Sequence, residues 1–94
     1  MDLTNMVLEA MDAEKNGDIN KAIQLYEQVI SKRFDGNRPY DRLAVIYHKQ
    51  KKYDDERRVL TLAIDVFTRD VNPSRADRLP KLQKFHDKLA KIKE

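Results

Sequence analysis

The stretch Asn16-Gly17-Asp18-Ile19-Asn20-Lys21-Ala22-Ile23 separates two segments in which apolar residues recur at helical spacing. The segment before it carries Leu3, Met6, Val7, Ala10 and Ala13, and the segment after it carries Ala22, Ile23, Tyr26, Val29 and Ile30. A glycine in the left-handed conformation commonly ends a helix, and Asn20 is a suitable residue to begin one. The stretch therefore predicts a tight turn between two amphipathic helices.

The same pattern returns 34 residues further along the chain. This shift aligns Met6 with Tyr40, Ala10 with Ala44, Ala13 with Tyr47, Ile19 with Tyr53, Val29 with Ala63 and Ile30 with Ile64. Few of these pairs are identical, but large residues meet large ones and small residues mostly meet small ones. A period of this length predicts a helical repeat protein.

Extending the pattern to the whole chain predicts five helices, over residues 2–16, 20–33, 37–50, 54–70 and 74–93. Pro39 falls in the first turn of the third helix, where its missing N–H is tolerated. Pro80 falls inside the fifth, so we expect it either to bend that helix or to mark where the regular part begins. The predicted fold class is all-α, in one domain over residues 1–94.

The repeat resembles the tetratricopeptide repeat (TPR) family over residues 3–68. In the second copy, Tyr40, Ala44 and Tyr47 match the family's large, small, large spacing. Around the first turn, Gly17, Ile19, Ala22 and Tyr26 match its turn and second helix, with an aliphatic residue at position 19 where the family has an aromatic one. Three residues depart from the family pattern: Lys51 replaces a turn glycine, Glu56 a small alanine and Glu9 a leucine.

The resemblance implies antiparallel helical hairpins that form a short right-handed α-solenoid. Repeat one would cover about 3–36, repeat two about 37–70, and a capping helix about 74–93. Because Lys51 occupies a glycine position, the turn that follows the third helix should differ from the first turn or be strained.

The resemblance also implies a protein-interaction scaffold or adaptor that binds a peptide or protein in a groove. The groove would be lined by the first helix of each repeat, at Val7, Met11, Glu14, Lys15, Asp41, Val45, His48 and Lys49. The alternative, that Val7, Met11 and Val45 merely pack under the capping helix, stays open. The lysines and asparagines with which some TPR domains clamp a terminal carboxylate are absent, because Val7, Met11, Asp41 and Val45 stand there.

The basic residues suggest a second function. The net charge is +3, and residues 69–94 carry eight basic and four acidic side chains, so the positive excess lies in this segment. Lys81, Lys84, Lys88 and Lys91 form one stripe of the last predicted helix. They are candidates for contacts with nucleic-acid phosphates, as an accessory module would make, or for contacts with acidic proteins. They also fit a solvated face, since no aromatic residue interleaves the lysines to stack on bases.

The sequence offers no basis for catalysis. It has no cysteine, no glycine-rich phosphate loop and no pair of histidines at metal-ligand spacing, so we expect a protein that is not an enzyme and has no cofactor or metal site. The N-terminal residues do not form a signal peptide, and no apolar run is long enough to cross a membrane. We therefore expect a cytoplasmic protein without membrane contact. A weak homodimer at high concentration is a further expectation, through the apolar residues Val7, Met11 and Val45.

Overall fold

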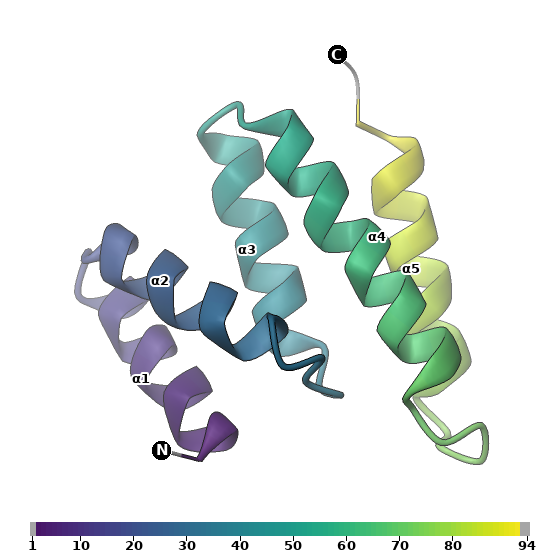
Figure 1. Ribbon diagram of the computed structural model, residues 1–94. Helices are drawn as coiled ribbons and strands as arrows, with labels where there is room; N and C mark the ends of the chain where they lie inside the picture. The colour runs from purple at the N-terminus through teal and green to yellow at the C-terminus, as the bar shows by residue number, and fades with distance from the viewer. Residues whose placement is uncertain (1, 93–94) are drawn as a thin grey trace.

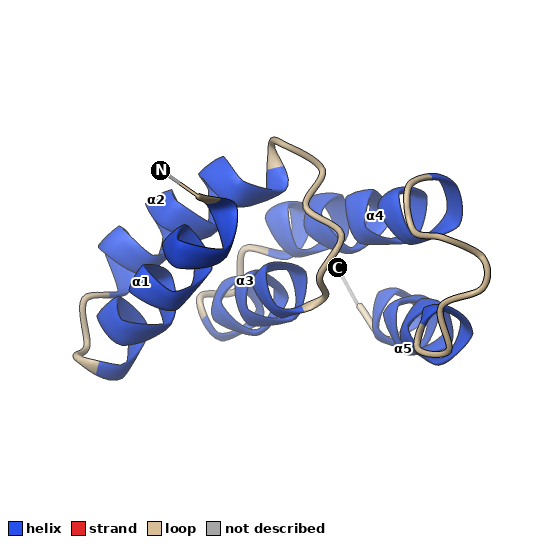
Figure 2. Ribbon diagram, turned by 90° about the horizontal axis from the view of Figure 1, so that it is seen from below, coloured by secondary structure: helices blue, strands red, loops and turns tan. Residues whose placement is uncertain are grey.

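The computed structural model describes residues 2–92 and confirms the all-α fold class, with no strand in that range. Five helices occupy the described chain: α1 (Leu3–Lys15), α2 (Ile19–Ile30), α3 (Arg38–Lys49), α4 (Tyr53–Arg69) and α5 (Arg78–Ala90). Each helix packs mainly against its neighbours in sequence, so the helices follow one another across the molecule in chain order (Figure 1). Seen from below, α3 and α5 lie on the same side of α4 (Figure 2).

The two turns that begin the second helix of each hairpin have the same hydrogen bonds, 34 residues apart. In the first turn, Asp18 N–H donates to the carbonyl of Ala13 at 2.8 Å, and Gly17 has φ of +85°. In the second, Lys52 N–H donates to the carbonyl of Tyr47 at 2.9 Å, and Lys51 has φ of +59°. The expected strain at Lys51 is confirmed, because a side chain disfavours this left-handed backbone.

Small residues allow the paired helices of the first hairpin to approach closely. Ala10 and Ala22 are fully buried. In the second hairpin Ala44 is also buried, but Glu56 stands at the position equivalent to Ala22 and is 6% exposed. A carboxylate at such a position needs polar partners to offset its desolvation. Glu56 belongs to the candidate site between α3 and α5.

Helix α5 packs on the second hairpin through Phe85. This residue is fully buried and lies edge-on to Tyr40 of α3 and Phe67 of α4, with ring centroids 6.4 and 5.3 Å away. Leu82, Leu89 and Ile92 are partly buried against the same core. The last helix therefore covers apolar residues of α3 and α4.

Charged side chains join the two hairpins at their boundary. Glu27 of α2 accepts hydrogen bonds from the Tyr47 hydroxyl of α3 and from the guanidinium of Arg58 in α4. Arg33, just after α2, donates to Asp65 and Asp70, each at 2.8 Å. These contacts fix the second hairpin against the first.

Three helix boundaries differ from the sequence prediction by three residues or more. α2 ends at Ile30 instead of 33, and Arg33 has a positive φ of 55°. α5 begins at Arg78 instead of 74, because Asn72 closes a turn by accepting from Ser74 N–H at 2.9 Å. Pro80 consequently lies in the first turn of α5, where no N–H is needed. α5 ends at Ala90, before the predicted end at residue 93, and residue 93 itself lies outside the described residues.

Candidate functional site

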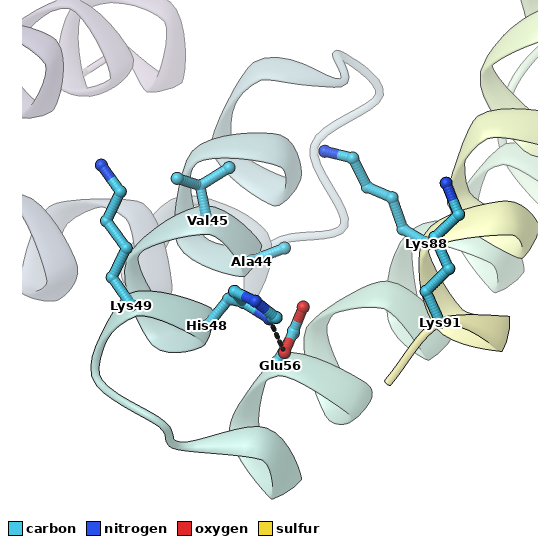
Figure 3. A pocket seen from close by; sticks show the side chains of 7 residues that line it. All are labelled: Ala44, Val45, His48, Lys49, Glu56, Lys88 and Lys91. Atoms are coloured by element: carbon cyan, nitrogen blue, oxygen red, sulfur yellow. Dashed lines mark hydrogen bonds and ion pairs between the residues drawn. The ribbon is translucent and has the colours of Figure 1, made fainter. Parts of the chain in front are cut away.

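A pocket of about 240 Å³ lies between α3 and α5, with α4 at its base. We call it the α3–α5 groove, and Figure 3 shows the side chains that line it. Its lining consists of Ala44, Val45, His48 and Lys49 from α3, Glu56 from α4, and Lys88 and Lys91 from α5. Most of the accessible lining is apolar, since the lysines contribute their alkyl chains as well as their ammonium groups.

The floor of the α3–α5 groove follows from the helical spacing of α3. The core-facing side of α3 consists of Leu43, Ala44 and Tyr47. Helical spacing therefore places Val45 and His48 at the edge of that side. Val45 is half-buried and His48 is exposed. The small side chain of Ala44 leaves the space that a larger residue at this position would fill. The result is an apolar surface accessible from outside.

A buried carboxylate lies at the base of the groove. His48 Nδ1 lies 3.1 Å from Glu56 Oε1, while the two side chains are 60% and 8% exposed. Figure 3 shows His48 directed at Glu56. The His48 ring also packs edge-on to Tyr53, with centroids 5.7 Å apart. His48 is thereby the hydrogen-bonding partner of the carboxylate at the position equivalent to Ala22.

The lysines stand on both sides of the apolar floor. Lys49 projects from α3 on one side, and Lys88 and Lys91 project from α5 on the other (Figure 3). Three ammonium groups and one carboxylate line the groove, so its net charge is positive. This arrangement can attract an anionic group while the floor contacts an apolar one.

Asp41 holds the lysines of α5 towards α3. Its side chain is 13% exposed, and its two oxygens lie 3.5 Å from the Lys88 ammonium and 3.9 Å from that of Lys84. Asn37 donates to Oδ2 at 2.6 Å, whereas buried Oδ1 accepts no hydrogen bond from the described residues. The carboxylate is therefore held in place on one side and only loosely paired on the other.

The structure brings the two sequence-predicted sites together. Three of the predicted groove residues line the α3–α5 groove, namely Val45, His48 and Lys49, and Asp41 lies beside it. Two residues of the basic stripe, Lys88 and Lys91, also line the groove, and a third, Lys84, reaches Asp41. The stripe faces α3 at these positions, and Lys81 is half-buried outside the lining. Sequence reasoning did not assign Ala44 or Glu56 to the groove, although Glu56 had already been noted as a departure from the repeat.

The predicted groove residues of the first helix lie elsewhere. Met11, Glu14 and Lys15 line a separate, more polar hollow of about 440 Å³ between α1 and α3. For Val7 the sequence left two positions open, one on the groove floor and one packed under the capping helix. The exposure of Val7 is only 7%, because it packs into the core between α1 and its neighbours.

Glu14 acts as a structural link in that second hollow. It accepts from Tyr26 at 3.0 Å and from Arg42 Nε at 3.0 and 3.1 Å. The hydrogen bond from Arg42 lowers the pKa of Glu14, burial opposes this, and the hydrogen bond from Tyr26 lowers the pKa further. Burial, with this hydrogen bond to Glu14, raises the pKa of Tyr26. These groups satisfy one another and leave little for a ligand to bind.

Comparison with protein-family models, curated proteins and solved structures gives no significant match. What the α3–α5 groove can bind is therefore inferred from its geometry alone. Within residues 2–92 no group of three or more potential ligands is placed to hold a metal ion. No helix of the described chain has the length and apolar content needed to cross a membrane.

Proposed function

We propose that this chain is a protein-interaction module of the tetratricopeptide-repeat type, which binds a segment of another polypeptide in the α3–α5 groove. The observation that carries the proposal is an accessible apolar surface at half-buried Val45, above buried Ala44, with charged side chains from three helices around it. Binding sites for polypeptide segments commonly combine apolar contact with polar edges.

The internal repeat supports the tetratricopeptide-type architecture. The two hairpins share the turn hydrogen bonds at positions 34 residues apart, and the last helix packs on the second hairpin through Phe85. Repeat units of this kind stack on their neighbours and leave a concave face for partners. The proposed right-handed solenoid has the first helix of repeat two and the capping helix on that face.

A binding selection tests the function. The intact chain would be immobilised and offered a display library of random peptides, and the enriched peptides would then be measured against two variants. Val45→Trp fills the α3–α5 groove, whereas Leu8→Trp adds the same ring at a position of α1 that is 53% exposed. We expect binding to fall at least about tenfold with Val45→Trp and to stay unchanged with Leu8→Trp.

Two results would count against this function. The first is a selection that enriches no peptide, and the second is peptides that bind Val45→Trp as tightly as the wild-type chain. Circular dichroism of both variants checks that the helices are intact, so that a loss of binding reports on the groove.

A further inference from the structure

The α3–α5 groove has a charge pattern that specifies its partner. Lys49, Lys88 and Lys91 surround the apolar floor, and Glu56 is largely buried with His48 beside it. A partner that approaches the floor therefore meets ammonium groups first. Complementary charges steer association and set partner choice, and they penalise segments of the wrong sign.

The structure already contains a carboxylate that lies beside one lysine of this groove, Lys88. Asp41 lies 3.5 Å from Lys88 and 3.9 Å from Lys84, distances at the outer limit of an ion pair. The Lys88 side chain is 31% exposed and lines the groove while it is paired. Such a part-exposed, loosely paired lysine contributes little to stability and can exchange one carboxylate for another.

The apolar floor distinguishes a peptide from a nucleic acid. Phosphate backbones pair with extended basic surfaces, and single strands add stacking on aromatic side chains. In this groove the lining is mainly apolar and includes a carboxylate at its base, and its one aromatic ring, His48, packs edge-on to Tyr53 and is directed at Glu56. An acidic peptide with one apolar side chain meets both the floor and the surrounding lysines.

From these observations we infer that the partner is an acidic polypeptide segment that places an apolar side chain against Val45, and that its carboxylates displace Asp41 from Lys88. Asp41 is then an internal competitor that weakens binding until a sufficiently acidic segment arrives. This inference rests on the proposed function and specifies the chemistry of the segment and the exchange at Lys88.

The peptides enriched by the selection provide the first test. We expect them to carry Asp or Glu on both sides of one Leu, Ile or Phe. Replacing all their acids by the amides should weaken binding at least about tenfold, and Lys88→Gln, which removes one part-exposed ion pair, should weaken it roughly two- to fivefold. Lys32→Gln is the matched control, since Lys32 is exposed and lies outside the lining, and it should leave the affinity unchanged.

The second test uses the competitor itself. Asp41→Asn removes the charge but keeps the shape, so we expect acidic peptides to bind roughly two- to fivefold more tightly, the range of a part-exposed ion pair. Asp54→Asn removes an equivalent first-turn acid of α4 that is 99% exposed, and it should change nothing. Thermal melts show whether Asp41→Asn stays folded at the assay temperature.

The outcomes separate this inference from the proposed function. Peptides that are neutral or basic, yet lose binding in Val45→Trp, would leave the function standing and overturn the acidic partner. Acidic peptides that bind Asp41→Asn no more tightly than wild type would overturn the exchange at Lys88. An oligonucleotide that binds, competes with the selected peptides and loses affinity in Lys88→Gln would favour nucleic acid as the partner and overturn the inference.

Discussion

The first hairpin, α1–α2, and the second, α3–α4, use equivalent positions differently. The first has Gly17 in its turn and Ala22 at the close approach of its helices, whereas the second has Lys51 and Glu56 there. Glu14 of the first is bonded to Tyr26 and Arg42, whereas its equivalent, His48, lies in the α3–α5 groove beside Glu56. The first hairpin thus keeps the residues that suit helix packing.

The residues in which the second hairpin differs from the first lie at or near the α3–α5 groove. Glu56 and His48 line it, and Lys51 lies in the turn that joins the two helices bearing them. Sequences that violate their own structural pattern often do so at functional sites, where local stability is sacrificed. We therefore regard the first hairpin as structural support and the second, with α5, as the part that carries the site.

The largest expected effect comes from separating α5 from the second hairpin. Phe85→Ala leaves a cavity beside Tyr40 and Phe67 and should lower the free energy of unfolding by about 3–5 kcal/mol. Leu79→Ala on the same helix is the control, since Leu79 is 68% exposed and should change stability little. Urea denaturation of both variants gives the comparison. Equal, small losses would mean that α5 is not needed by the second hairpin.

Exchanging the residues at the close-approach position tests the difference between hairpins directly. Ala22→Glu places a charge in a fully buried site, and we expect it to lower the free energy of unfolding by about 2–4 kcal/mol. Glu56→Ala removes a buried carboxylate and should shift stability by less than about 1 kcal/mol. Thermal denaturation measures both. If the two substitutions were equally harmful, positions 22 and 56 would not be equivalent.

The link from Glu14 of α1 to Tyr26 of α2 and Arg42 of α3 predicts a pH dependence of the free energy of unfolding. Because the pKa of Glu14 is lowered on folding, its ionised form stabilises the protein above the unfolded-state pKa, and this stabilisation is lost as the pH falls through the folded-state pKa. Glu14→Gln should lower the free energy of unfolding by about 1.5–3 kcal/mol at neutral pH, since it weakens charged hydrogen bonds.

The difference between the wild-type chain and Glu14→Gln is the informative quantity, because the Arg partners of Asp65, Asp70 and Asp77 also lower the pKa of those exposed carboxyls. Urea denaturation at a series of pH values should show this difference shrinking as the solution is acidified below the ordinary pKa of a glutamate. A difference that stays constant with pH would contradict the assigned role of Glu14.

The smallest effect concerns the two turns. Gly17→Lys should destabilise the protein by about 1–2 kcal/mol through the backbone alone, because no atom lies within 4 Å of an added Cβ. Lys51→Gly should stabilise it by up to about 1 kcal/mol, as the left-handed backbone is relieved and the greater unfolded-state freedom of glycine offsets part of the gain. Thermal melts of the two variants measure these changes in stability. If Gly17→Lys and Lys51→Gly changed stability in the same direction, the two turns would not be alike.

The repeat made much of the fold predictable, whereas the site was predictable only in parts. The spacing of Tyr40, Ala44 and Tyr47 located α3, and the glycine position marked Lys51 as a residue whose turn should either differ from the first turn or be strained. Helical periodicity says which face a residue occupies but not which distant helix faces it. Lys88 was therefore assigned to a separate stripe, although it lies against Asp41.

The predicted start of α5 and the groove position that the repeat implies for Val7 differ from the structure for a similar reason. Asn72 and Ser74 close a side-chain turn that helical spacing does not reveal, so the start of α5 was placed too early. Val7 was placed in the groove by its position in the repeat, but its neighbours in the packed structure bury it. Glu56 carried the most useful signal, because a charged residue at a small-residue position needs a local partner.

The most direct test of the account is a titration of the isotope-labelled chain with a selected acidic peptide, followed by NMR of the backbone amides. If the second hairpin and α5 carry the site, the largest shifts should fall in residues 44–49, 56 and 85–91, and the amides of residues 3–30 should change little. Largest shifts within residues 3–30, with the α3–α5 groove unaffected, would contradict the assignment of support and function to the two hairpins.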